Sequence, residues 1–153
     1  MKRIMFVCHG NICRSPMAGL IMKKLVSDAG LQGKYQIESS ATSTEEIGNP
    51  VYPPAVRELA HHGISAKGKH AVQLSPLDLD KYDMFIGMDS ANMRNMRRIL
   101  GEGCEGKIYK MMSFVGSDDD VADPWYSGGF DRTYSDIDYA CHALLCKLEG
   151  NED

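Results

Sequence analysis

The chain has 153 residues, of which 43% are hydrophobic and 25% charged, so it has the length and composition of one globular domain with a buried core. Its formal net charge of −4 argues against a dedicated nucleic-acid binder. No apolar run approaches the roughly 18 residues of a membrane span, and the N-terminal apolar segment stops at His9, too early for a signal peptide. We therefore expect one cytoplasmic domain over residues 1–153, with no nucleic-acid or membrane partner.

The five cysteines are odd in number and irregularly spaced, which predicts no disulfide framework and favours a reducing compartment. Four residues separate Cys8 from Cys13, which is too wide for the usual zinc-binding pair, and no second pair follows at ligand spacing. The sequence therefore predicts no metal site.

The first expected element is a strand at 3–7, where the apolar residues do not alternate with polar ones, as in a strand buried on both faces. A helix is expected next, because Ser15 is a good N-cap and Pro16 suits the first helical position. Its apolar stripe has helical spacing and ends before Gly30; it consists of Ala18, Ile21, Met22 and Leu25.

Strands and helices alternate through the rest of the chain. We expect strands at 35–42, 82–89 and 107–110, helices at 53–62, 90–100 and 136–148, and a loop at 117–129. This alternation predicts an α/β fold with a parallel sheet, helices on both faces and right-handed crossovers. Ligands of such sheets bind beyond the carboxyl ends of the strands, and Cys8 follows the first strand.

The segment CHGNICRS, residues 8–15, has the features of an oxyanion site. Gly10 and Asn11 can adopt a positive φ, and amides turned inward in a tight loop form an anion-binding nest. The N-terminus of the following helix adds partial positive charge, and Arg14 can offer two parallel donors to a phosphate. The expected phosphate-binding residues are His9, Gly10, Asn11, Ile12, Cys13, Arg14 and Ser15.

A thiol inside such a nest is favoured as the thiolate. Cys8 would then attack a bound phosphoryl group and form a thiophosphate, while the amides and Arg14 stabilise the transition state. The hydroxyl of Ser15 would donate to the thiolate, cap the helix, or alternate between these roles. In the alternative interpretation, Cys8 is merely buried at a strand end and Arg14 lies on the surface. The position of the segment between a strand and a helix favours the functional interpretation.

A departing oxygen needs a proton donor, and the loop at 117–129 holds four aspartates. The run 118–120 is typical of a solvated acidic segment. Asp123 differs because Pro124, Trp125 and Tyr126 follow it, and aromatic residues can enclose a substrate ring. From the residues alone, Asp123 is either a general acid or the first residue of a turn-forming Asp-Pro pair.

Two motifs at this spacing carry a resemblance to a known family: C-x-G-N-x-C-R-S-P at residues 8–16 and D-P-aromatic at residues 123–125. Further similar stretches are SSATS at 39–43, EIGNP at 46–50, HHGI at 61–64 and MDSANMR at 88–94. Over nearly its whole length the sequence resembles the low-molecular-weight protein tyrosine phosphatases.

The resemblance implies a flavodoxin-like three-layer sandwich with a four-stranded parallel sheet. It implies hydrolysis of phosphotyrosine in proteins or peptides, binding of phosphate or similar oxyanions, and no metal or organic cofactor. By the same resemblance, Cys8 is the nucleophile, Arg14 holds the phosphate, and Asp123 is the acid that then activates water.

The resemblance also assigns supporting residues. Asn11, Ser15 and Ser39 would form a hydrogen-bond network that maintains the shape of the loop. Cys13 would form a reversible disulfide with Cys8 under oxidation. The substrate wall would consist of Ile12, Glu45, Trp125 and Tyr126, and Glu45 departs from the aromatic residue common at its position. Its charge would disfavour acidic peptides and favour basic ones.

Three alternatives remain. Family members that act on phosphoarginine tend to carry a small polar residue at the position of Ile12, so Ile12 favours phosphotyrosine. An arsenate reductase on the same scaffold would need further cysteines after the third strand, and residues 84–96 contain none. A catalytically silent oxyanion-binding module would not need Cys8, Arg14 and Asp123 together.

Overall fold

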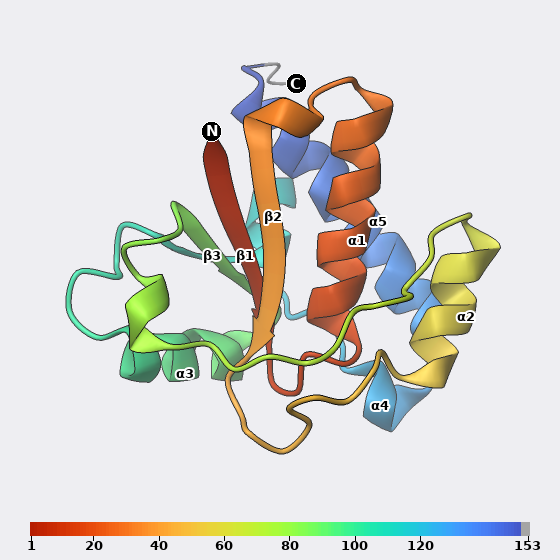
Figure 1. Ribbon diagram of the computed structural model, residues 1–153, viewed down its shortest axis with the longest axis horizontal. Coiled ribbons are helices and arrows are strands. Elements are labelled where there is room, and N and C mark those ends of the chain that lie inside the picture. The colour runs from red at the N-terminus through yellow and green to blue at the C-terminus, as the bar shows by residue number, and fades with distance from the viewer. Residues whose placement is uncertain (151–153) are drawn as a thin grey trace.

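The computed structural model describes residues 1–150 and contains a four-stranded parallel sheet in the order β2-β1-β3-β4 (Figure 1). The strands are β1 (Lys2–Cys8), β2 (Tyr35–Ala41), β3 (Met84–Gly87) and β4 (Ile108–Lys110). The helices are α1 (Arg14–Asp28), α2 (Pro53–His61), α3 (Ser90–Leu100), α4 (Pro124–Ser127) and α5 (Phe130–Leu148). The predicted flavodoxin-like α/β fold is confirmed. The last residues of the predicted domain, 151–153, lie outside the described part of the chain.

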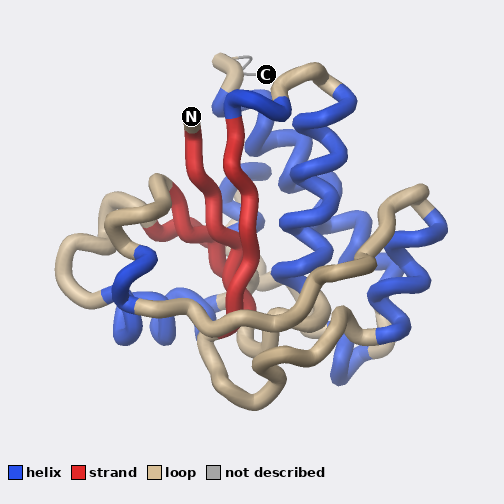
Figure 2. Tube along the Cα trace, in the orientation of Figure 1, coloured by secondary structure: helices blue, strands red, loops and turns tan. Residues whose placement is uncertain are grey.

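Strand β1 is buried on both faces, as its non-alternating sequence predicts. Ile4 and Phe6 pack in a core cluster with residues of α1, α2 and α5. Met5 and Val7 point to the opposite face and pack in a second cluster with residues of α3. The sheet is therefore the middle layer, with α1, α2 and α5 on one side and α3 on the other (Figures 1 and 2).

The C-terminal helix is longer than predicted, because α5 begins at Phe130 rather than at residue 136. The start at residue 136 was predicted from the apolar residues at helical spacing, of which Ile137 is the first. In the structure, Phe130 packs against the core and Tyr134, one turn later, is buried, so two aromatic residues extend the buried face toward the N-terminus. Within the predicted loop, residues 124–127 form the single turn of α4.

The predicted N-cap of the first helix is wrong. Helix α1 begins at Arg14, its N-cap position is Cys13, and no side chain caps it. Ser15 is fully buried inside the first turn and makes other hydrogen bonds. Its hydroxyl is therefore committed to the loop that precedes the helix.

The loops that follow the strands meet at the carboxyl edge of the sheet, as the tan segments in Figure 2 show. Backbone hydrogen bonds join Thr42 N to the carbonyl of Cys8 (2.9 Å), Ser43 N to that of His9 (3.0 Å), and Val121 N to that of Met88 (2.8 Å). The loops after β1, β2 and β3 and the segment before α4 therefore share one site. No described helix combines the length and hydropathy needed to cross a membrane.

Candidate active site

The loop after β1 wraps around the sulfur of Cys8. Asn11 is the only described non-glycine residue with a positive φ, of 59°, and this left-handed turn aims its backbone amide at Cys8 Sγ, 3.3 Å away. Gly10, which could also have adopted a positive φ, does not. A Cβ on Gly10 would lie 3.4 Å from Cγ of Glu46, which is close to ordinary van der Waals contact.

The side chain of Asn11 stabilises the shape of this loop through its hydrogen bonds. Its Oδ1 accepts a hydrogen bond from the backbone amide of Val72 (3.1 Å), which fixes which end of the carboxamide is the donor. Its Nδ2 donates to Ser15 Oγ (2.7 Å) and to Ser39 Oγ (3.0 Å). The structure thus brings together the three residues assigned to the loop network, all of them buried.

The donation from Asn11 determines what the hydroxyl of Ser15 can do. Because Ser15 Oγ accepts from Asn11, its own hydrogen is left for Cys8 Sγ at 3.0 Å or for the carbonyl of Ser40 at 3.4 Å. The shorter distance favours Cys8. The sulfur therefore receives one hydroxyl and one amide, and both stabilise a negative sulfur more than a neutral one.

Arg14 is 3% exposed, which excludes the alternative that it is a surface residue. Its Nη1 donates to Asp89 Oδ2 (2.8 Å) and to the carbonyl of Val121 (2.9 Å), and its Nη2 lies 3.6 Å from Asp123 Oδ2. Burial lowers the pKa of Arg14, but the charges of Cys8, Asp89 and Asp123 outweigh burial and raise it. Within residues 1–150, all hydrogen bonds of this side chain come from Nη1, so the Nε–Nη2 edge is available to an oxyanion.

Asp89 was not predicted as a site residue. It follows β3 and caps α3: its Oδ1 accepts from Asn92 N (2.7 Å), while Oδ2 accepts from Arg14. The amide oxygen of Asn92 accepts in turn from the backbone amides of Met88 and Asp89. The sequence places Asp89 at the carboxyl end of a predicted strand, but only the strand order β2-β1-β3-β4 shows that this strand lies beside β1 and its Cys8.

The structure shows Asp123 as a helix-capping residue and also places it beside Arg14, while its role as a general acid stays a prediction. Its Oδ1 accepts from Trp125 N (3.0 Å) and caps α4, as a turn-forming aspartate would. Its Oδ2 faces Arg14, and its side chain is 31% exposed. Cys8, Arg14 and Asp123 line one cavity of about 230 Å³, together with His9, Gly10, Ile12, Cys13, Glu45, Glu46, Trp125 and Tyr126.

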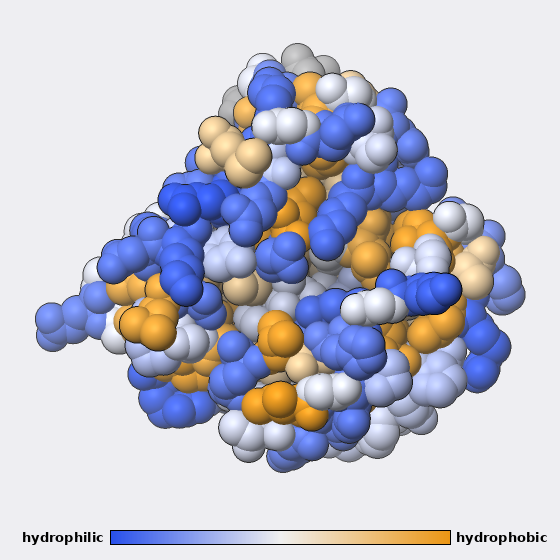
Figure 3. Space-filling model, viewed as in Figure 1, coloured by the Kyte–Doolittle hydropathy of each residue, from blue (hydrophilic) through white to orange (hydrophobic). Residues whose placement is uncertain are grey.

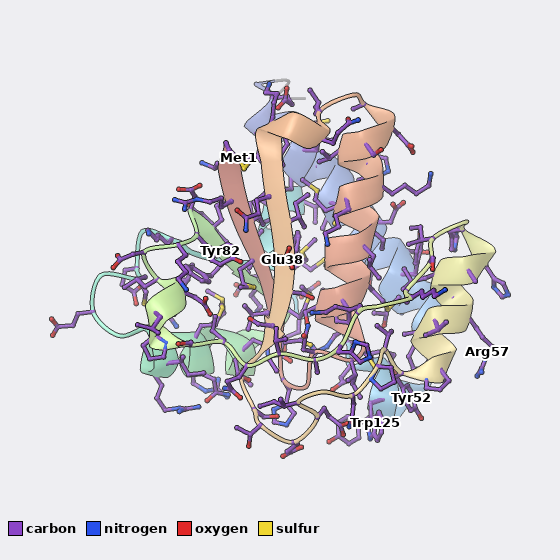
Figure 4. The ribbon with its side chains drawn as sticks, viewed as in Figure 1. Met1, Glu38, Tyr52, Arg57, Tyr82 and Trp125 are labelled. Atoms are coloured by element: carbon purple, nitrogen blue, oxygen red, sulfur yellow. The ribbon has the colours of Figure 1, made fainter. Side chains whose placement is uncertain are left out.

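The aromatic wall of the cavity, Trp125 and Tyr126, is supported by Tyr52, a residue outside the lining that was not predicted from the sequence. Trp125 is 50% exposed and Tyr126 is 87% exposed, so both present their rings to an incoming group. The ring of Tyr52 packs against Trp125 (Figure 4), with 4.5 Å between centroids. Tyr52 also packs against Phe130, with 6.0 Å between centroids. Tyr52 therefore contacts Trp125 directly, and Phe130 contacts Tyr52 in turn.

Glu45 lines the cavity where an aromatic residue would be usual. Its Oε2 lies 3.3 Å from Nε2 of His9, and both side chains are exposed. The ring of His9 is thus engaged at the rim, while its backbone belongs to the loop. On the face shown in Figure 3, hydrophobic residues form small patches among hydrophilic ones. The exposed His9 and Glu45 side chains therefore make this part of the cavity rim polar.

Cys13 lines the same cavity as Cys8 and is buried. Burial, together with the charges of Cys8 and Asp123, raises the pKa of Cys13 to about 12, so it is a neutral thiol at pH 7. All five cysteines are free in the structure. Among the described residues, no three His, Cys, Asp or Glu side chains group as metal ligands would.

A thiol held by an amide and a hydroxyl, beside a buried arginine and an aspartate at the carboxyl edge of a parallel sheet, defines a cysteine-dependent phosphatase. The family model for low molecular weight phosphotyrosine protein phosphatase matches residues 3–153. The chain belongs to this family and is a protein tyrosine phosphatase.

Individual relatives agree over nearly the full length. The low molecular weight protein-tyrosine-phosphatase YfkJ of Bacillus subtilis is 37% identical over 151 residues, with 97% of each chain covered. The crystal structure of YfkJ superposes with a TM-score of 0.93 at 36% identity and covers 100% of this chain and 98% of its own. The phosphatase of Sus scrofa is 35% identical over 156 residues, covering 96% of both chains. Vibrio vulnificus Wzb, solved with benzylphosphonate, has a TM-score of 0.85 at 26% identity, covering 96% and 99%.

Proposed function

We propose that Cys8, Arg14 and Asp123 are the catalytic residues of a two-step hydrolysis of phosphotyrosine. The observation that carries this proposal is the position of Cys8 Sγ, which lies 3.0 Å from Ser15 Oγ and 3.3 Å from Asn11 N in the cavity that holds Arg14 and Asp123. Nucleophile, charge-stabilising donors and proton donor are then within reach of one bound group.

In the first step, the sulfur of Cys8 attacks the phosphorus, and the bond between phosphorus and the tyrosine oxygen breaks. Protonated Asp123 donates its proton to the leaving oxygen. The amides of the loop and the free edge of Arg14 hold the three remaining oxygens as charge develops on them. The product of this step is a thiophosphate on Cys8, with the dephosphorylated tyrosine released.

In the second step, Asp123, now a carboxylate, takes a proton from a water molecule that attacks the phosphorus. The sulfur–phosphorus bond breaks, and the electron pair returns to the sulfur. The hydroxyl of Ser15 and the amide of Asn11 stabilise the thiolate as it leaves. Inorganic phosphate departs, and Asp123 is again protonated.

The proposed substrates are tyrosine-phosphorylated proteins or peptides. An aromatic ring would lie between Ile12 on the loop and the exposed rings of Trp125 and Tyr126. The related Wzb was solved with benzylphosphonate, a phosphonate with an aromatic ring. Ile12 contributes only apolar contact at the position where a phosphoarginine site would need a polar group.

A further proposal concerns the oxidation of Cys8. When peroxide oxidises the Cys8 thiolate to a sulfenic acid, the thiol of Cys13 would attack its sulfur, releasing water and leaving a disulfide. Support comes from the cavity that the two cysteines share.

A catalytic thiol needs a reducing compartment, so we place the protein in the cytoplasm. We also propose that residues 1–153 form one domain that needs no cofactor.

The test compares initial rates on phosphotyrosine, phosphoserine and phosphoarginine peptides, with arsenate reduction measured in parallel. We expect hydrolysis of the phosphotyrosine peptide alone, and no turnover by Cys8→Ser. The Cys8→Ser variant should still bind phosphate, because the amides and Arg14 remain. A preference for phosphoarginine, turnover of arsenate, or a substantial rate with Cys8→Ser would contradict the proposal.

A further inference from the structure

A second cavity adjoins the active site. It has a volume of about 470 Å³ and lies between the loop after β2 and helix α3, with His9 and Glu45 as the residues it shares with the catalytic cavity. The loop contributes Thr42 and Thr44, and α3 contributes Asn95 and Arg98. A peptide with its phosphotyrosine in the catalytic cavity would therefore reach this second cavity by passing over the His9–Glu45 pair.

Arg98 is a cation on the wall of this cavity that forms no ion pair with another described residue. Its side chain makes one hydrogen bond, from Nη2 to Asn95 Oδ1 at 3.4 Å. The adjacent Arg97, in contrast, pairs with Glu105 at 2.9 Å. The one carboxylate among the lining residues, Glu45, contacts His9 at 3.3 Å and not Arg98. The guanidinium of Arg98 is thus available to a ligand at the edge of a polar cavity.

Two polar groups of residues that line the same cavity also lack partners. Thr42 Oγ1 and Gln73 Oε1 are buried and have no hydrogen-bond partner among the described residues, and Thr42 is 5% exposed. Gln73 Nε2 donates to the carbonyl of Thr42 at 3.1 Å, so the two residues are held together. Unpartnered buried polar groups are uncommon in folded proteins, and they cluster at this cavity.

We propose that this cavity is an accessory subsite for the carboxylate side chain of an Asp or Glu that flanks the phosphotyrosine of the substrate. Arg98 is the cation that pairs with the carboxylate, and the polar lining around Thr42 and Gln73 receives the adjoining polar groups. The inference rests on the proposed function, since the subsite selects among phosphotyrosine peptides. Because Glu45 lines the same cavity and its charge disfavours acidic groups, the carboxylate is placed at the end of the cavity formed by Arg98 on α3.

The experiment uses one phosphotyrosine peptide with a single Asp moved through the positions on either side, each paired with the same peptide carrying Asn. The readout is the ratio of kcat/KM for Asp over Asn, which cancels any general change in activity. For the wild type we expect a ratio of about two to five at one position, the range of a partly exposed ion pair, with the effect in KM. Higher salt should reduce the ratio.

Arg98→Gln should bring the ratio to one, and Arg98→Lys should retain part of it. Arg94→Gln is the matched control, because Arg94 is exposed on the same helix but does not line the cavity. A ratio of one at every position in the wild type, a ratio unchanged by Arg98→Gln, or an equal loss with Arg94→Gln would overturn the inference alone. No hydrolysis of any phosphotyrosine peptide by the wild type would overturn the proposed function as well.

Discussion

The carboxamide of Asn11 orients the donors around the nucleophile. Because Val72 N fixes its oxygen end, its nitrogen must donate to Ser15 and Ser39, and the hydroxyl of Ser15 is left for Cys8. An aspartate at position 11 could not make these donations, since a carboxylate only accepts. The strained φ of 59° at Asn11 is thus maintained by the same side chain that organises the network.

Removal of the carboxyl group of Asp123 should lower kcat by an amount that depends on the leaving group of the substrate. We expect Asp123→Ala to lower kcat on phosphotyrosine by about 10²-fold or more, because general acid catalysis contributes about 10²–10⁴-fold. Aryl phosphates with acidic leaving groups need little protonation and should lose much less. Rates on a series of substituted phenyl phosphates measure this; an equal loss across the series would rule out the general acid.

At Asp89, the matched variants separate charge from helix capping. Asp89→Asn retains a good N-cap for α3 but loses the charge that pairs with Arg14. We expect kcat/KM to fall about tenfold or more, the usual cost of a hydrogen bond to a charged group, with little change in thermal midpoint. Asp89→Ala should lower both kcat/KM and the thermal midpoint. Unchanged kinetics for Asp89→Asn would show that Val121 alone is sufficient to position Arg14.

At the residue scale, the sequence was most informative where the chemistry is local. The residues from Cys8 to Ser15 are contiguous, so a strand, a turn and a helix are sufficient to place them together. Asp89 and Tyr52 were missed because they reach the site through strand order and loop packing, which no local pattern encodes. The residues alone left Ser15 open between a helix cap and a donor to Cys8, because the local pattern does not show that Asn11 Nδ2 occupies the acceptor side of its hydroxyl.

At the scale of elements, the aromatic cluster connects the loop after β2 to the Asp123 segment. Tyr52 is tied to the catalytic loop by a hydrogen bond from its amide to the carbonyl of Ile12 (2.9 Å), and its ring packs on Trp125. Trp125 N in turn binds Asp123. Tyr52 therefore links the Asp123 segment to the loop after β1, and we expect it to position the proposed proton donor.

Tyr52→Ala should loosen the Asp123 segment, whereas Tyr52→Phe keeps the ring. We expect Tyr52→Ala to resemble Asp123→Ala, with a loss in kcat that is largest for poor leaving groups, and we expect Tyr52→Phe to restore the rate. The same substituted phenyl phosphates provide the measurement. A loss that is uniform across leaving groups would mean that Tyr52 contributes to stability and not to placement of the acid.

Prediction of elements from the sequence succeeded for every strand but misplaced the starts of α1 and α5 and missed the single turn of α4. The β strands were identified because their runs are short, apolar and bounded by polar residues. The first turns of α5 were missed because Phe130 and Tyr134 are separated by charged and polar residues, and only the fold shows that both face the core. The turn of α4 is too short for any periodic pattern and depends on its cap at Asp123.

Over the whole molecule, four buried groups predict a loss of stability in alkali. Burial, with a smaller effect from neighbouring charges, raises the pKa of Tyr134 to about 12. Burial also raises the pKa of Cys141 well above its ordinary value. Burial raises the pKa of Cys13 to about 12, and burial with the hydrogen bond to Glu149 does the same for Tyr35. The fold therefore keeps protons that the unfolded chain releases above the ordinary pKa values of 9.0 for Cys and 10.0 for Tyr.

Since the folded state binds more protons in this range, the free energy of unfolding should be level near neutral pH and fall as pH rises from about 9 toward 12. Urea unfolding at a series of pH values measures the slope. Tyr134→Phe keeps the ring that stacks on His62 but removes one titrating group, so its slope should be shallower above pH 10. A stability independent of pH, or an unchanged slope in the variant, would contradict this assignment.

The most direct measurement of the central claim identifies the atom that carries the phosphoryl group during turnover. The Asp123→Ala variant should form the thiophosphate rapidly from an activated aryl phosphate but hydrolyse it slowly, because the base for water is absent. Quenching with denaturant at neutral pH and peptide mass mapping should find one phosphoryl group on the peptide that contains Cys8, and none after Cys8→Ser. A phosphoryl group on another residue, or undiminished turnover by Cys8→Ser, would contradict the account.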